Sequence, residues 1–339
     1  MSDNDLRIGI VGLGFGRWHA QTLVNLDGAR LVAVADRRAP DLHDFASRYG
    51  ATPYPDAIEM IQRAELDVVS VCVSPRGRGP VLEASAARGV AMFVEKPWAT
   101  DVKQARRYAE ICRASSAPVM VGFSFRFHPA VRRLRALIDS ELGPARLASG
   151  HYVHAWLPPA DFWLWDPANG NGFINENACH LLDVVCHLLG RPTRVSAEAA
   201  NFSGSPSEDA VVVTLRFQSG SLAALTFALA SKRGMVASPR LDLVTENGKA
   251  ALLGKDHIWH GLEWAPAGDA HTYRLQAPPE TAAATRYTDA WRHFLHCVRD
   301  AATPSSPIED GVRGVELAAA IGQAIRIGAA VELDAVGPM

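Results

Sequence analysis

The first 122 residues repeat one pattern, in which short apolar runs alternate with amphipathic stretches. Several of the runs are rich in β-branched residues, as strands buried on both faces usually are. Parallel strands need a crossover between them, so the alternation predicts a parallel sheet with helices on both faces. The predicted strands are Leu6–Val11, Leu31–Ala35, Val68–Val73, Ala91–Val94 and Val119–Val121, and two of the predicted helices are Pro80–Arg88 and Asp101–Ala114.

The rest of the chain follows a different pattern. A predicted helix at Pro129–Asp139 precedes strand-like segments that follow one another, and Asn247-Gly248 is typical of a hairpin turn. Further helices are expected over residues 175–189 and about 284–330, and 339 residues suffice for about two domains. We therefore predict an α/β chain, with a doubly wound parallel sheet over residues 1–122 and a mostly antiparallel sheet over 123–339. The predicted strands of the second domain are Leu147–Trp156, Arg194–Asn201, Ala210–Phe217, Leu222–Leu229, Leu241–Thr245 and Ala250–Leu253.

Charge, cysteine content and hydropathy exclude several classes of protein. A net charge of −2 and a pI of about 6.6 argue against nucleic acid or an anionic membrane as a partner. The five cysteines show no CxxC spacing and indicate reduced thiols. The N-terminus does not resemble a signal peptide, and the longest apolar run, near Leu222–Ala230, is too short to span a bilayer. We expect a soluble cytoplasmic protein.

A glycine-rich loop, GLGFGRWHA at residues 12–20, directly follows the first predicted strand. Glycines between a strand and a helix let the backbone approach a pyrophosphate, which then lies at the helix N-terminus. The full fingerprint would need glycine at position 17, where this chain has Arg17 and places its third glycine one residue earlier. A plain tight turn is the alternative interpretation. The residues expected to bind the dinucleotide here are Gly12, Gly14, Phe15 and Gly16.

An acidic residue, Asp36, ends the second predicted strand about 20 residues after the last glycine. At that place an acid binds the hydroxyls of the adenosine ribose. Arg37 follows, and its guanidinium could stack on adenine or meet a 2′-phosphate. Asp36 therefore favours NAD as the cofactor, whereas Arg37 keeps NADP possible.

The stretch Glu95-Lys96-Pro97 follows the predicted strand Ala91–Val94. Ligands bind outside the carboxyl ends of the strands in doubly wound sheets, and Pro97 favours an extended backbone at Lys96. A lysine there can bind a substrate hydroxyl or assist its deprotonation when burial lowers its pKa. A surface lysine at a strand end explains the same residues equally well.

The predicted helix 175–189 is apolar except for Glu176, His180, Asp183 and His187, which fall within roughly 60° of one another on an α-helix. Three interpretations fit this pattern: an acid–base pair, a metal site, and a buried histidine–carboxylate network. One helix rarely supplies three metal ligands, so we expect no metal. Before this helix lie aromatic residues, among them Trp156 and Trp163, whose faces can stack on sugar or cyclitol rings.

Taken together, several motifs resemble the Gfo/Idh/MocA family, named for glucose–fructose oxidoreductase, inositol dehydrogenase and a rhizopine-catabolism protein. The resemblance covers nearly the whole chain and implies a Rossmann domain followed by an α/β domain with an open, mostly antiparallel sheet. The sequence departs from the family pattern at Gly79, Ser74 and Ser124, and the run RGRG at residues 76–79 is unusual. The motifs are GLGFGRWHA, Asp36, Ser74-Pro75, EKP at 95–97, GFSFRFHPA at 122–130 and NENACHLLD at 175–183.

The resemblance implies a role for each matching residue. Lys96 is the lysine that contacts nicotinamide and substrate, His180 the general acid–base, and Glu176 its partner, while Asp183 and His187 are structural. Ser74, Pro75 and Glu95 join the cofactor site. The residues expected near the substrate are Arg126, His154, Trp156, Trp163, Asn177 and, more weakly, Arg233.

The expected activity is hydride transfer between NAD, or NADP, and a hydroxyl or ketone of a sugar, cyclitol or sugar derivative. The resemblance leaves two alternatives, an NAD-dependent glycoside hydrolase and a non-catalytic dinucleotide-binding regulator. It also implies a homodimer or homotetramer formed through the sheet of the second domain.

Overall fold

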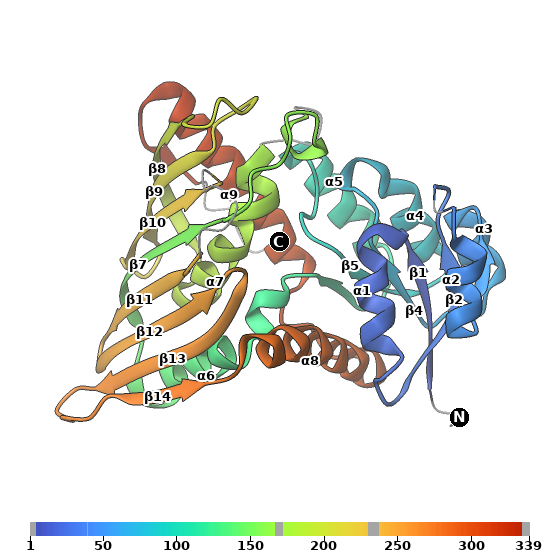
Figure 1. The fold of residues 1–339 in the computed structure, drawn as a ribbon, viewed down its shortest axis with the longest axis horizontal. Helices are drawn as coiled ribbons and strands as arrows, with labels where there is room; N and C mark the ends of the chain where they lie inside the picture. The colour runs from blue at the N-terminus through green and yellow to red at the C-terminus, as the bar shows by residue number, and fades with distance from the viewer. Residues whose placement is uncertain (1–4, 39, 167–171, 230–236, 334–339) are drawn as a thin grey trace. The chain divides into compact units, whose positions relative to one another are not determined.

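The computed structural model describes residues 5–38, 40–166, 172–229 and 237–333. The chain divides into two units, one of Met1–Phe123 with Tyr287–Val315 and one of Ser124–Arg286 with Glu316–Met339 (Figure 1). Our sequence-based division placed all of residues 123–339 in the second domain. The difference arises because two long helices, α8 (Pro279–Asp300) and α9 (Ile308–Ile327), each contribute to both units.

The first unit contains the predicted parallel sheet, with six strands in the order β3-β2-β1-β4-β5-β6. All five pairs of neighbouring strands are parallel. The short edge strand β3 was not predicted, and its central Pro53 is tolerated because an edge strand needs fewer donors. The strands are β1 (Leu6–Val11), β2 (Ala29–Ala35), β3 (Thr52–Tyr54), β4 (Val68–Val71), β5 (Ala91–Val94) and β6 (Val119–Val121).

Strand register aligns the carboxyl ends of this sheet. Val11 pairs with both Ala35 and Val71, and Val71 pairs with Val94, so the loops after these strands leave from one edge. β2 and β4 lie on opposite sides of β1, so the strand order reverses direction at β1. Doubly wound sheets bind ligands at such a switch point. The helices of this unit are α1 (Leu13–Leu23), α2 (Leu42–Tyr49), α3 (Ala57–Arg63), α4 (Gly79–Ala87) and α5 (Val102–Arg113).

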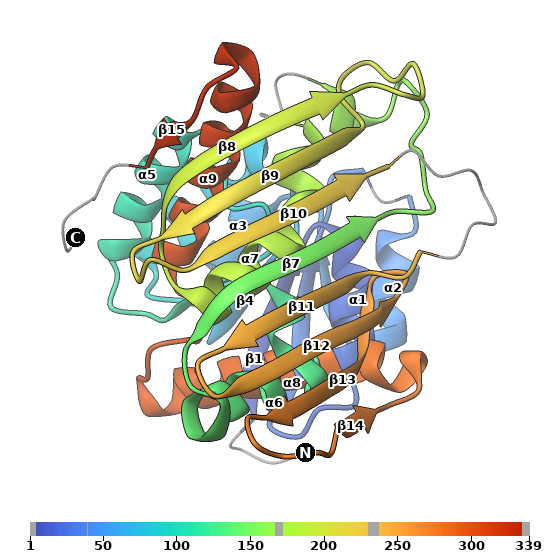
Figure 2. The same cartoon turned by 90° about the vertical axis from the view of Figure 1, so that its left-hand side faces the viewer.

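The second unit is built on a nine-stranded sheet in the order β14-β13-β12-β11-β7-β10-β9-β8-β15 (Figure 2). Only the β10–β7 pair is parallel among its described neighbours, so the predicted mostly antiparallel sheet is confirmed. The last three strands were not predicted. The strands are β7 (Ala145–Val153), β8 (Pro192–Ala200), β9 (Ala210–Phe217), β10 (Leu222–Ala228), β11 (Arg240–Thr245), β12 (Gly248–Lys255), β13 (Ile258–Pro266), β14 (Tyr273–Gln276) and β15 (Val331–Glu332).

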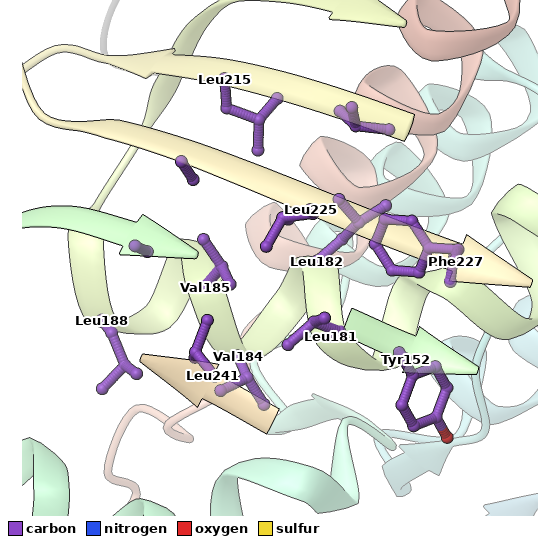
Figure 3. Close-up of a cluster of buried hydrophobic side chains, with 14 of the residues drawn as sticks. Tyr152, Leu181, Leu182, Val184, Val185, Leu188, Leu215, Leu225, Phe227 and Leu241 are labelled. Carbon is purple, nitrogen blue, oxygen red and sulfur yellow. The ribbon is translucent and has the colours of Figure 1, made fainter. Parts of the chain in front are cut away.

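One face of this sheet carries the core of the second unit. Burial alternates along the strands, with the inward side chains of β9 and β10 fully buried. They pack against α6 (Pro129–Leu137), α7 (Cys179–Leu189) and the end of α9. Figure 3 shows Val184 of α7 beside Leu241 of β11, and both belong to the same buried cluster as Leu225 and Phe227 of β10. Each such side chain contributes about 1.5–3 kcal/mol when it leaves water.

The helix predicted over residues 175–189 is not a single α-helix. It begins with a π-helical turn, Ile174–Ala178, and continues as α7 from Cys179. Hydrogen bonds in a π-helix span five residues, so the turn places Glu176 at a different angle from the one we predicted relative to His180. Such turns are frequent at functional sites. No helix in the described part of the chain is both long and apolar enough to cross a bilayer.

Candidate active site

The three glycines after β1 have three different structural roles. Gly12 has a φ of 91°, and a Cβ there would lie 2.9 Å from the backbone of Cys72. A Cβ at Gly14 would meet nothing within 4 Å, so this position stays open for a ligand. A Cβ at Gly16 would lie 2.6 Å from Ile10 Cγ2, which shows that this glycine lets α1 pack closely on β1. These are the roles of the dinucleotide fingerprint, with the third glycine one residue early.

Asp36 lies where β2 ends, against the start of α1. Its Oδ2 accepts a hydrogen bond from the Leu13 backbone N–H at 2.7 Å, and its Oδ1 accepts one from the Arg38 N–H at 2.7 Å. A carboxylate at a helix N-terminus is stabilised by the unpaired N–H groups and the helix dipole. The loop, the helix start and the predicted ribose-binding acid therefore come together, while Arg37 is exposed. Arg17, at the place of the missing glycine, pairs with Asp41 at 2.7 Å.

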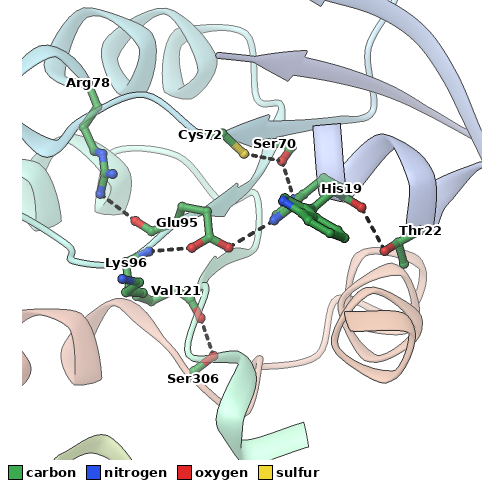
Figure 4. A network of polar contacts seen from close by, with 10 residues as sticks. His19, Thr22, Ser70, Cys72, Arg78, Glu95, Lys96, Val121 and Ser306 are labelled. Atoms are coloured by element: carbon green, nitrogen blue, oxygen red, sulfur yellow. Dashed lines mark hydrogen bonds and ion pairs between the residues drawn. The ribbon is translucent and has the colours of Figure 1, made fainter. Parts of the chain in front are cut away.

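Glu95, the first residue of the EKP stretch, belongs to a network of buried polar contacts with His19, Ser70 and Cys72 (Figure 4). His19 Nε2 lies 3.0 Å from Glu95 Oε1, and His19 Nδ1 lies 2.8 Å from Ser70 Oγ. Ser70 Oγ is in turn 3.3 Å from Cys72 Sγ. Burial alone would lower the pKa of His19, but Cys72 and Glu95 beside it raise the pKa to about 10. The raised pKa of His19 favours its protonated form, and with it a buried ion pair with Glu95.

Lys96 follows at the edge where the switch point lies. Its side chain is half-buried, its backbone N–H donates to Glu95 Oε2 at 3.2 Å, and its peptide bond to Pro97 is cis. Ser74 and Pro75 occupy the neighbouring loop after β4, where the Pro75 carbonyl accepts a hydrogen bond from Tyr108 Oη at 2.9 Å. The loops after β1, β4 and β5 thus carry the predicted cofactor residues to the carboxyl edge of one sheet.

In the second unit, His180 lies in the first turn of α7. Its ring stacks on Phe125, with 4.3 Å between the ring centres and 15° between their planes. The same ring also contacts a cation, since Arg286 Cζ lies 5.0 Å from its centre. Glu176 and Asn177 lie in the π-helical turn, and the Glu176 carbonyl accepts a hydrogen bond from Cys179 Sγ at 3.2 Å. Phe125 thus fixes the plane of the predicted acid–base residue.

Arg126 and Asp183 form a buried ion pair. Arg126 Nε donates to Asp183 Oδ2 at 2.9 Å, and Nη2 donates to Oδ1 at 2.5 Å. Both side chains are 6% exposed. Burying two charges is favourable only when the geometry is good, and this two-point contact provides it. The arginine that we predicted near the substrate is therefore held by the aspartate that we predicted to be structural.

His154 belongs to a cluster of rings at the end of β7. Its ring centre is 3.9 Å from that of His257 and 4.6 Å from that of Tyr152. Tyr152 Oη lies 2.7 Å from His257 Nδ1. His128 is buried nearby in the same unit, and burial together with the Arg286 charge holds the pKa of His128 well below its usual value. The sequence did not single out Tyr152, His128 or His257.

The aromatic residues of the predicted substrate loop stay together but lie outside the strand. β7 ends at Val153, so Trp156 is not part of it, contrary to our prediction. Trp156 packs edge-on against Phe162 at 5.3 Å, and Phe162 lies 5.7 Å from Trp163. Both tryptophans are exposed. Arg233 lies outside the described residues.

The described residues contain no group of three or more His, Cys, Asp or Glu side chains placed to hold a metal ion. His19 was not predicted as a site residue, although a histidine one turn beyond a glycine loop is a recognisable position. Its partners come from β4 and the end of β5, so only the assembled sheet reveals the buried ion pair.

Two family profiles match the chain. Residues 6–123 match one described as an oxidoreductase family with an NAD-binding Rossmann fold, and residues 131–251 match a GFO/IDH/MocA C-terminal domain. Inositol 2-dehydrogenase 4 of Saccharopolyspora erythraea is 31% identical over 266 residues, 75% of each chain. D-Apiose dehydrogenase of Paraburkholderia graminis is 26% identical and covers 96% of this chain and 89% of its own.

Solved structures show the same fold. A levoglucosan dehydrogenase in complex with NADH and levoglucosan superimposes with a TM-score of 0.86, covering 97% of this chain and 99% of its own. Its sequence identity is 17%, so this likeness concerns the fold.

Proposed function

Because the chain belongs to the Gfo/Idh/MocA family of oxidoreductases with an NAD-binding Rossmann fold, we propose that it transfers hydride between NAD and a sugar-like substrate. The substrate class is a hydroxyl or ketone of a sugar, cyclitol or sugar derivative. The named activities of the relatives, inositol 2-dehydrogenase and D-apiose dehydrogenase, support this class.

The observation that carries the proposal is the junction of β1, α1 and Asp36. Gly12 adopts a positive φ beside Cys72, the helix begins immediately afterwards at Leu13, and Gly14 in its first turn leaves open space. Asp36 is held at this helix start by the Leu13 N–H. The residues present therefore fit a dinucleotide, with the pyrophosphate at the N-terminus of α1 and the ribose hydroxyls at Asp36.

We assign the chemistry to three residues. NAD, when bound, would supply the hydride acceptor for the substrate carbon. His180 takes the hydroxyl proton, since a histidine exchanges protons readily near neutral pH. The Lys96 ammonium stabilises the developing alkoxide, and Glu176 assists His180. In the reductive direction His180 returns the proton to the oxygen.

The substrate contacts remain part of this proposal. Asn177, beside Glu176 in the π-helical turn, is buried and polar, which supports a role in orienting a hydroxyl. Trp156 and Trp163 are exposed aromatic faces of the kind that stack on sugar rings. We place Arg126 and His154 at the substrate as well, with Arg126 oriented by its pairing with Asp183.

The first test of the proposal is a titration of tryptophan fluorescence with NADH and, separately, with NADPH. We expect saturable quenching by NADH and binding of NADPH about tenfold weaker or more, because the Asp36 carboxylate repels a 2′-phosphate. Asp36→Asn should reduce this preference, since it removes the charge and keeps an acceptor for the Leu13 N–H. After that, inositols, D-apiose and levoglucosan form the substrate panel.

If neither nucleotide quenches the tryptophan fluorescence, the protein must be checked for nucleotide that is already bound. If a denatured extract contains no nucleotide absorbance either, the oxidoreductase proposal is wrong. Release of free sugar from a glycoside without net NADH formation would instead indicate an NAD-dependent hydrolase.

We also propose a homodimer or homotetramer formed through the open face of the nine-stranded sheet. Figure 2 shows this face, on which Leu222, Leu147 and Val244 lie side by side across β10, β7 and β11. They are 42%, 46% and 52% exposed, an apolar row that a partner would cover.

Light scattering should give a multiple of 36.5 kDa. Leu147→Glu should shift the mass to the monomer, whereas Val24→Glu, at another exposed site, should not. A monomeric wild type contradicts the proposal.

A further inference from the structure

The unusual run RGRG, residues 76–79, contains a deeply buried arginine. Arg76 and Gly77 are exposed, but Arg78 is only 1% exposed. Burial of a guanidinium carries a large desolvation cost unless its N–H groups find acceptors. Desolvation lowers the pKa of Arg78 to about 10, so the side chain still carries its charge at neutral pH. A buried charge at this point of the chain requires a structural reason.

The reason lies in the EKP stretch. Arg78 Nη1 donates to the backbone carbonyls of Glu95 at 2.7 Å, Pro97 at 2.7 Å and Trp98 at 3.0 Å. Nη2 donates to the Val73 carbonyl at 2.9 Å. Figure 4 shows Arg78 reaching the Glu95 carbonyl beside Lys96. The guanidinium therefore gathers carbonyls from both sides of Lys96, and connects them to the loop after β4.

The Glu95 side chain holds the same stretch from the opposite direction. One carboxylate oxygen meets the buried His19 ring, and the other accepts the Lys96 backbone N–H. Gly122 closes the space, since a Cβ there would lie 2.8 Å from Glu95 Oε1. The backbone of Lys96 is thus fixed through the residue before it and the two residues after it. The Lys96 side chain itself is half-buried.

We propose that Arg78 is a positioning residue for Lys96, because its four hydrogen bonds fix the backbone from which the Lys96 ammonium reaches nicotinamide and substrate. The inference rests on the function proposed for Lys96. An arginine suits this task because its planar group presents several donors in fixed directions. Lysine at position 78 would offer one compact ammonium and could not reach the same set of carbonyls.

The test compares two ligands that differ by the nicotinamide, NADH and ADP-ribose, by calorimetric titration. Wild type should bind NADH more tightly, and Lys96→Met should reduce the ratio of the two affinities about tenfold, the effect of one charged hydrogen bond. Arg78→Met should reduce the ratio by a similar factor although Lys96 is present. ADP-ribose should still bind within about threefold of wild type, and the double variant should lose no more than either single variant.

Arg88 provides a matched control. It also donates to backbone carbonyls, but to those of Ile61 and Gln62 in α3 and not to the carbonyls around Lys96 that Arg78 contacts. Arg88→Met should leave the ratio of NADH to ADP-ribose affinity unchanged. If Arg78→Met does not fold, Arg78→Lys keeps the charge with fewer carbonyl contacts and should still reduce the ratio.

Three outcomes overturn the inference. An unchanged ratio in Arg78→Met, or in Arg78→Lys where the methionine variant does not fold, shows that Lys96 needs no such support. Equal losses for both ligands show that Arg78 only stabilises the unit. A ratio unchanged by Lys96→Met removes the function proposed for the lysine, and is distinguishable because wild type still binds NADH.

Discussion

Replacing Lys96 with methionine is expected to lower kcat about 10²- to 10⁴-fold, the range typical of a group that stabilises charge or moves a proton in the transition state. Methionine keeps much of the length of the side chain and removes the ammonium. NADH binding should weaken by about tenfold at most, because the glycine loop and Asp36 are untouched. The measurement is NADH formation with the sugar or cyclitol to which wild type responds.

Lys103→Met is the control for this variant. Lys103 is exposed on α5 in the same unit, so the substitution removes the same charge without touching the EKP stretch. Its kcat should match wild type. A near-normal kcat in Lys96→Met would show that the lysine is a surface residue at a strand end, the alternative that the sequence left open.

Replacing His180 with glutamine should lower kcat by a comparable factor, about 10²- to 10⁴-fold, while the affinity for NADH stays unchanged. Glutamine can still form hydrogen bonds but cannot exchange a proton near neutral pH. The stack of His180 on Phe125, at 4.3 Å, supports a ring held in a fixed plane rather than a mobile surface residue. The measurement is kcat with the sugar or cyclitol to which wild type responds.

His187→Gln is the matched control, since His187 is half-buried and lies two turns further along the same helix. It should keep kcat within a few-fold of wild type. If His180→Gln behaves in the same way as this control, another group carries the proton and the assignment of His180 is wrong.

The fold of the first unit could be predicted closely because its strands are buried on both faces. Leu6–Val11, Ala91–Val94 and Val119–Val121 have the predicted bounds, since short, mostly apolar runs between amphipathic helices leave little choice. In the second unit β14 was missed because four residues, YRLQ, are too short for their alternation to distinguish a strand from a loop. The π-helical turn at Ile174–Ala178 was missed because one extra residue in a turn leaves no mark on an apolar pattern.

The candidate site was predictable as a set of positions but not as a set of contacts. Gly12, Gly14, Gly16 and Asp36 lie close together in sequence, so local pattern sufficed to bring them together. The pairing of Arg126 with Asp183 spans 57 residues, and that of His19 with Glu95 spans 76. Such contacts depend on the packing of whole elements, and the buried Arg78 likewise looked like one basic residue in an odd loop.

The helices α8 and α9 also constrain how the chain can be made. The core of the first unit needs residues 287–315 as well as residues 1–123. Phe93 stacks on Trp291 with 4.6 Å between the ring centres, and Ser306 Oγ donates to the Val121 carbonyl at 2.7 Å. A Cβ at Gly311 would lie 2.9 Å from Trp98. Ribosomes release domains from the N-terminus onward, and domains usually fold in that order. In this protein the core of the first unit cannot be completed until every strand of the nine-stranded sheet except β15 has been synthesised. Vectorial, domain-by-domain folding during translation is therefore not open to this chain.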